Sequence, residues 1–136
     1  MIGQAQTEEL LRVAKEARDR SYSPYSHYSV GAALLAQDGR IYQGCNIENA
    51  SFTPTICAER TAFFKAIYDG VRNFSAIAVI GSGVLPAYPC GVCRQVMAEF
   101  CDGDFVIVTS NADGSEIVTE TLEDMLPHRF GPKDLP

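Results

Sequence analysis

The arrangement of three cysteines constrains the fold of this chain more than any other feature of its sequence. Cys90 and Cys93 are separated by two residues, and Cys57 lies far before them. Thiolates bind zinc well, and two cysteines at this spacing can reach one metal ion from a tight turn that opens into a helix. Cys57 can add a third ligand only if one helix and one strand return the chain to the same place. The spacing therefore predicts that the two cysteine segments lie side by side.

A zinc ion bound by three cysteines keeps one tetrahedral position free. Structural zinc sites are normally closed by four protein ligands, whereas catalytic sites keep three and leave a place for a reacting group. Glu59 follows Cys57 by two residues, and its carboxylate can move protons near a water molecule without binding the metal. The pattern predicts one Zn²⁺ per chain, held by Cys57, Cys90 and Cys93, with Glu59 as catalytic acid and base. The alternative for Glu59 is an exposed residue favoured by the helix dipole.

Apolar periodicity and turn residues divide the chain into alternating helices and strands. Helices are expected at about residues 6–20 and 57–68, from Cys90 onward with Val92, Val96 and Phe100 along one face, and from Thr121 to just before Pro127. Strands are expected at residues 28–36, 41–45, 75–80, 105–109 and 115–119. Asp38-Gly39 predicts a hairpin between the first two strands, and residues 46–56 are expected to form a loop.

This order of elements predicts an α/β fold, a three-layer α/β/α sandwich around a mixed five-stranded sheet. The length of 136 residues fits one domain covering residues 1–136. Because strand–helix–strand crossovers are nearly always right-handed, the helices that begin at Cys57 and Cys90 should be neighbours on one sheet face. The free N–H groups and dipole of a helix N-terminus favour negative charge, so two such ends would stabilise thiolates.

Composition argues against several classes of function. The net charge of −6 opposes nucleic-acid binding, because phosphate backbones are bound by clustered lysine and arginine. An acidic chain suits a small neutral substrate. Charged residues interrupt the first twenty positions, so we expect no signal peptide, no membrane span and a cytoplasmic location. An odd count of five cysteines favours free thiols and metal ligands over disulfides.

Four segments of the chain resemble the motifs of one enzyme family. They are Tyr28-Ser29-Val30-Gly31-Ala32-Ala33, Asn46-Ile47-Glu48-Asn49-Ala50, Cys57-Ala58-Glu59-Arg60-Thr61-Ala62 and Pro89-Cys90-Gly91-Val92-Cys93-Arg94-Gln95. In this order, over nearly the whole chain, they resemble small cytidine deaminases with three cysteine ligands; zinc deaminases share the cysteine–glutamate and Pro-Cys-x-x-Cys signature. The resemblance implies a cytidine deaminase-like fold and hydrolytic deamination of cytidine and 2′-deoxycytidine in pyrimidine salvage. It also implies a homotetramer with active sites at subunit interfaces.

Further residues are expected to bind the nucleoside. Asn46 and Glu48 are separated by one residue, so they point the same way in an extended loop and can bind ribose hydroxyls; the resemblance implies the 3′-hydroxyl. Tyr28 stands where the family usually has a phenylalanine that stacks on the base, and Ala58 is expected to contact the substrate. Phe130 resembles an aromatic residue that reaches into a neighbouring subunit's pocket; an ordinary contact of the C-terminal tail is the alternative.

Two arginines follow metal ligands closely in the sequence. Three thiolates leave a zinc centre with net negative charge, which works against activation of water. Arg60 and Arg94 are therefore expected to donate hydrogen bonds to sulfur, and the resemblance favours Arg60 as the main partner. Ordinary surface ion pairs are the alternative for both.

Two other functions fit parts of the pattern. A non-enzymatic zinc module would need a fourth protein ligand, which Cys45 or Cys101 would have to supply. An enzyme acting on another cytosine-bearing compound, such as a nucleoside antibiotic or a nucleic acid, would share the metal site. The segment from Cys57 to Thr61, together with Asn46 and Glu48, fits nucleoside deaminases better than antibiotic deaminases.

Overall fold

The structure, a computed structural model, describes residues 2–136 and confirms the expected order of helices and strands. The elements are α1 (Gln4–Arg18), β1 (Val30–Ala36), β2 (Ile41–Cys45), α2 (Ala58–Tyr68), β3 (Phe74–Gly81), α3 (Gly91–Phe100), β4 (Val106–Ser110), β5 (Ile117–Thr121), α4 (Leu122–Met125) and a 3-10 turn (Pro132–Asp134). In this part of the chain no helix is long and apolar enough to cross a membrane.

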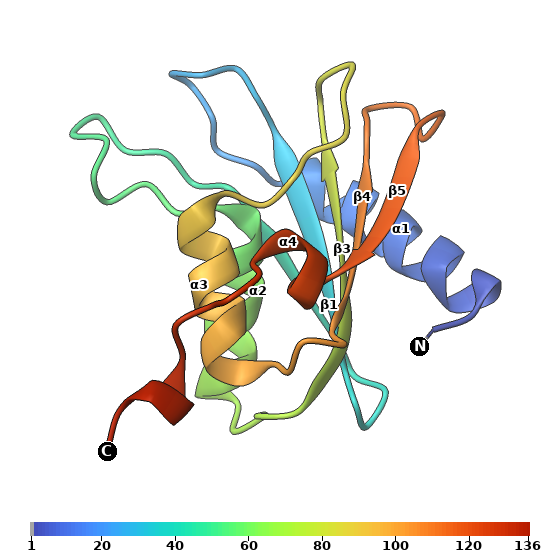
Figure 1. The fold of residues 1–136 in the computed structure, drawn as a ribbon. Coiled ribbons are helices and arrows are strands. Elements are labelled where there is room, and N and C mark those ends of the chain that lie inside the picture. Colours follow the sequence, from blue (N-terminus) through green and yellow to red (C-terminus); the bar gives the residue numbers. More distant parts are fainter. Residues whose placement is uncertain (1) are drawn as a thin grey trace.

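One mixed sheet of five strands, in the order β2-β1-β3-β4-β5, forms the middle layer. The β3–β4 pair is parallel and the other neighbouring strands are antiparallel. Helix α1 covers one face, while α2 and α3 lie side by side on the other (Figure 1). The predicted three-layer α/β/α sandwich is confirmed.

Strand β1 contributes to the apolar core on both faces of the sheet. Ala33 and Leu35 pack in the core beneath α1, whereas Ala32 and Leu34 pack in the core beneath α2 and α3. Successive side chains of a strand point to opposite faces, so a strand covered on both sides must be apolar throughout. This explains the continuous apolar sequence from Gly31 to Ala36.

Two glycines allow helices to lie directly on the backbone of the sheet. A Cβ atom on Gly31 would stand 2.0 Å from the carbonyl oxygen of Ala14 in α1, and one on Gly44 would stand 2.2 Å from that of Ala58 in α2. Both distances are far below van der Waals contact. The contact at Gly44 places the first turn of α2, which follows Cys57, against the end of β2.

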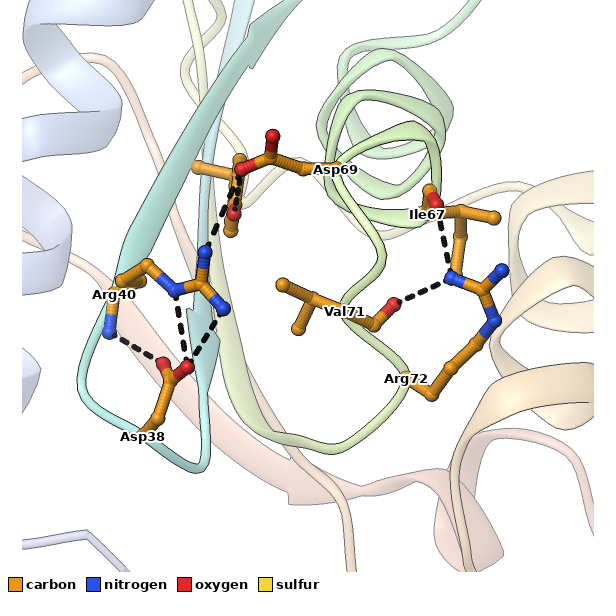
Figure 2. A network of polar contacts seen from close by, with 7 residues as sticks. Asp38, Arg40, Ile67, Asp69, Val71 and Arg72 are labelled. Carbon is orange, nitrogen blue, oxygen red and sulfur yellow. Dashed lines mark hydrogen bonds and ion pairs between the residues drawn. The ribbon is translucent and has the colours of Figure 1, made fainter.

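A polar network ties the β1–β2 hairpin to the far end of α2 (Figure 2). Arg40 pairs with Asp38 at 2.8 Å and with Asp69 at 3.5 Å. Arg72 donates to the carbonyl oxygen of Ile67 in the last turn of α2 and to that of Val71, which follows the helix. The ion-paired side chains are more than half exposed, so each pair contributes little stability. The network lies at the end of α2 opposite to Cys57.

Several boundaries differ from those expected, for local reasons. β1 begins at Val30 rather than at Tyr28, because the backbone of Tyr28 bonds to the side chains of Ser26 and Asn46 instead of to the sheet. β5 lies two residues later than predicted, at Ile117–Thr121. The short helix α4 does begin after Thr121, whose hydroxyl accepts from the N–H of Asp124 in a capping box.

The apolar residues expected along one face of α3 differ in their burial. Val96 and Phe100 pack against the core, whereas Val92 is 57% exposed; the buried positions of the helix are Cys93, Met97 and Ala98. Cys93 has to point toward the other two cysteines, and this requirement sets the rotation of the helix. Val92 is therefore turned away from the core of this chain.

Candidate functional site

Three cysteine sulfurs converge where α2 and α3 begin. Cys57 is the N-cap of α2, Cys90 is the N-cap of α3, and Cys93 lies in the first turn of α3. Their Sγ atoms all lie within 4.8 Å of one another, and those of Cys57 and Cys90 are 3.8 Å apart. Tetrahedral Zn²⁺ with Zn–S bonds of about 2.3 Å separates its sulfurs by about 3.8 Å. The donor set therefore fits zinc in type and spacing.

The surroundings of the sulfurs favour a thiolate at Cys57. A hydrogen bond from the Cys93 thiol, aided by hydrogen bonds from Arg60 and Cys90, lowers the pKa of Cys57 to about 5 against the opposing effect of burial. Arg60 Nη2 donates to Cys57 Sγ at 3.5 Å, while its buried Nε has no hydrogen-bond partner in the described residues. The same bond to Cys57, together with burial, raises the pKa of Cys93. Protons must leave such thiols when a metal binds.

Arg94 does not have the role expected from its sequence position. Its Nε donates to the carbonyl oxygen of Pro89 at 2.8 Å, and its Nη1 donates to that of Met125 at 2.7 Å. These bonds tie the loop before Cys90 to α4. The expected hydrogen bond from Arg94 to a sulfur is therefore replaced by two bonds to the backbone.

Glu59 is buried in the first turn of α2, beside the sulfurs. The residue is 4% exposed, and burial, reinforced by the charge of Cys57, raises the pKa of its carboxyl to about 7. A carboxyl group that is half protonated near neutral pH can both accept and donate protons. Glu59 is therefore not the exposed helix N-terminal residue that was considered as the alternative.

A cavity of about 250 Å³ opens next to Glu59 and the cysteines. Four residues expected at the substrate line it, namely Tyr28, Asn46, Glu48 and Ala58, together with Cys57, Glu59 and Cys90. Sequence reasoning missed other lining residues: Ser26, Val30, Thr55, Ile56, Val79, Ala87 and Tyr88. Most of these residues are apolar, and an apolar residue in the sequence gives no indication that it will line a cavity. Its place at the cavity is decided by how the strands and loops pack.

The polar groups of Asn46 are nearly all used by the protein. Its Oδ1 accepts from the N–H of Val30 at 2.9 Å and from the hydroxyl of Ser21 at 2.5 Å, and its Nδ2 donates to the carbonyl oxygen of Tyr28 at 2.8 Å. An amide nitrogen has two hydrogens. Asn46 therefore keeps one N–H donor for a ligand.

Glu48 is held by the loop before β1. Its Oε1 accepts from the backbone N–H of Tyr25 at 2.9 Å and of Ser26 at 3.1 Å, and its Oε2 accepts from the hydroxyl of Ser26. The hydrogen bond from the Ser26 side chain is the main cause that lowers the pKa of Glu48. Because a carboxylate has about four acceptor positions, about one remains free.

Tyr28 lies beside glycine backbone at the cavity wall. A Cβ atom on Gly81 would stand 2.2 Å from the Tyr28 hydroxyl oxygen, and one on Gly83 would stand 3.2 Å from its ring. Burial, and secondarily the charge of Glu59, raises the pKa of Tyr28. The ring thus forms part of the cavity wall, and its stacking on a base stays a prediction.

Phe130 does not line the cavity of its own chain. Its side chain is 57% exposed, and its backbone oxygen accepts from Gln95 Nε2 at 2.8 Å. Contact with a neighbouring subunit's pocket stays a prediction.

The fold and the site together define an α/β/α domain with an open three-cysteine metal centre. Residues 4–109 match the family described as cytidine and deoxycytidylate deaminase zinc-binding region. The chain is 52% identical over 128 residues to cytidine deaminase of Sporosarcina psychrophila, covering 94% of this chain and 93% of that protein. It is 48% identical over 126 residues to cytidine deaminase of Halalkalibacterium halodurans, covering 93% and 95%.

Solved structures agree with this relationship. The crystal structure of cytidine deaminase from Burkholderia pseudomallei matches with a TM-score of 0.87 and 44% identity, over 90% of this chain and 98% of that chain. The chain belongs to the cytidine and deoxycytidylate deaminase family. The resemblance, the fold class and the predicted zinc cofactor are thereby confirmed.

Proposed function

We propose that this protein hydrolyses cytidine and 2′-deoxycytidine to uridine and 2′-deoxyuridine, with release of ammonia. The observation that carries the proposal is Glu59, which is buried beside three converging cysteines on the wall of a cavity and has a pKa of about 7. A structural zinc module would need a fourth protein ligand, and in residues 2–136 only Cys57, Cys90 and Cys93 form a metal-binding group. This grouping disfavours the non-enzymatic alternative.

The chemistry divides between the metal and Glu59. Zinc bound by the three cysteines supplies activation of a water molecule for attack at C4 of the pyrimidine. Glu59 would accept a proton from that water and deliver it to the ring nitrogen N3. It would then take the proton of the new hydroxyl at C4 and pass it to the amine, so that the C4–N bond breaks, ammonia leaves and the C4 carbonyl forms. Arg60, through its bond to Cys57 Sγ, offsets part of the negative charge of the thiolates.

The sugar contacts support acceptance of both ribose and deoxyribose. Asn46 keeps one donor and Glu48 keeps about one acceptor after their bonds to the protein. One hydroxyl group both donates and accepts, so a single sugar hydroxyl is complementary to this pair. The resemblance implies the 3′-hydroxyl, which cytidine and deoxycytidine share. Neither residue needs a 2′-hydroxyl to complete its hydrogen bonds.

Assembly and location complete the proposal. A homotetramer with active sites at subunit interfaces is supported by exposed apolar side chains on α2 and α3, among them Tyr68, which is 94% exposed, and Val92. Phe130, outside its own cavity, is then available to a neighbouring subunit.

We expect residues 1–136 to act as one domain. Five free cysteines in the described chain support a reducing cytoplasm, where the reaction serves pyrimidine salvage.

Ultraviolet absorbance tests the proposal. Purified protein should remove cytidine and deoxycytidine absorbance, lose this activity with a zinc chelator, and contain about one zinc per chain. Firmly bound zinc without turnover of either nucleoside would refute the substrate assignment and direct attention to other cytosine-bearing compounds, nucleoside antibiotics first.

A further inference from the structure

The hydroxyl of Ser26 joins the two residues expected to hold the sugar and the base. Ser26 Oγ donates to Glu48 Oε2 and accepts from the backbone N–H of Tyr28 at 3.0 Å. His27, between Ser26 and Tyr28, has a φ of 57°, which turns the chain so that the N–H of Tyr28 returns to Ser26. One hydroxyl therefore bonds to both residues, and Glu48 is the one whose side chain it holds.

Ser26 also lies at the junction of two hollows. Ser26 lines the cavity beside Glu59. It also lines a neighbouring hollow of about 410 Å³, whose other lining residues include the aromatic Tyr25 and Phe52. Glu48 lines both as well. Without the Ser26 hydroxyl, Glu48 Oε2 would lose its hydrogen-bond partner in the described chain, and the carboxylate could turn toward solvent in the second hollow.

We propose that Ser26 is a positioning residue for nucleoside binding, which acts by fixing the Glu48 carboxylate toward the sugar hydroxyl. This inference rests on the proposed function. The Ser26 bond is also the main cause that lowers the pKa of Glu48, as expected for a hydrogen bond to the ionised carboxylate. The Ser26 hydroxyl donates its one proton to Glu48, so Ser26 acts on the substrate through Glu48 and not as a proton donor in the reaction.

Such a residue has a defined kinetic signature. A contact that binds substrate and transition state equally raises KM when it is lost and leaves kcat unchanged. Hydrogen bonds to charged groups contribute about tenfold or more in binding. Ser26→Ala should raise KM for cytidine about tenfold, with kcat within about twofold of wild type, whereas Ser26→Thr, which keeps the hydroxyl, should restore KM.

The experiment compares four proteins loaded with zinc: wild type, Ser26→Ala, Glu48→Gln and the double variant. If Ser26 acts through Glu48, adding Ser26→Ala to Glu48→Gln should change KM by less than about twofold, because the two effects share one interaction. Ser51→Ala is the matched control, since Ser51 is also an exposed loop serine and its hydroxyl bonds to Asn49 rather than to Glu48. It should leave KM unchanged.

A substrate analogue gives a second readout. With 2′,3′-dideoxycytidine, which lacks the hydroxyl expected to meet Glu48, Ser26→Ala and wild type should have the same KM. Multiplicative effects in the double variant, or an equal loss with the analogue, would overturn the positioning role while leaving cytidine deamination intact. A wild-type protein without activity would instead refute the proposed function together with this inference.

Discussion

Gly44 provides the most direct test of how the fold positions the metal centre. A Cβ atom at this position would stand 2.2 Å from Ala58 O and 2.6 Å from Ala62 N, about 1 Å short of the 3.4 Å at which ordinary contact begins. Both obstacles are backbone atoms of α2, which cannot rotate away. Gly44→Ala must therefore push the first turn of α2, with Cys57 and Glu59, off the sheet by about 1 Å.

The size of the effect follows from this displacement. Overpacking of a core costs about 1–3 kcal/mol, which for a domain of this size lowers Tm by about 3–10 °C. A misplacement of about 1 Å at a catalytic group costs about 100-fold in rate. We expect Gly44→Ala to lower kcat/KM for cytidine by about that factor and to weaken zinc retention against a chelator.

Gly91→Ala is the matched control for Gly44→Ala. Gly91 lies between Cys90 and Cys93 in the first turn of α3, and a Cβ atom there would meet nothing within 4 Å. Alanine in a helix is favoured over glycine by up to about 1 kcal/mol. This variant should keep Tm and activity. Calorimetry, metal analysis and the ultraviolet assay measure all three quantities, and a Gly44→Ala protein with wild-type Tm and kcat/KM would refute the close-packing argument.

Three further variants separate the roles of individual residues. Glu59→Gln should keep its fold and zinc but lose at least about 100-fold in kcat, because general acid–base catalysis contributes this much; nearly full activity would exclude Glu59 as the proton carrier. Cys90→Ala should lose most of its zinc and unfold at lower temperature, and full zinc occupancy by metal analysis would mean that Cys90 is not a ligand. Arg94→Ala removes two bonds to backbone oxygens and should lower the free energy of unfolding by about 2 kcal/mol in urea titrations; unchanged stability would contradict this structural role.

The sequence by itself determined the order of elements and the metal ligands. Turn chemistry placed the hairpin at Asp38-Gly39, where Gly39 has a φ of 96°, and the spacing of Cys57 from Cys90 and Cys93 required two helix starts to meet. These features are predictable because they depend on local backbone preferences and on the few geometries that let thiolates share one ion. The motif around Glu59 also predicted a proton-transfer role for this residue, because the motif is recognised from the order of residues alone.

Only the tertiary structure decided which groups around the site are free to act. Arg94 is committed to the carbonyl oxygens of Pro89 and Met125, and Ser26 is joined to Glu48, 22 positions away. The burial that raises the pKa of Glu59 is likewise visible only in the tertiary structure. Each depends on segments distant in sequence packing against one another, and a hydrogen bond or a burial exists only once both partners have been brought together.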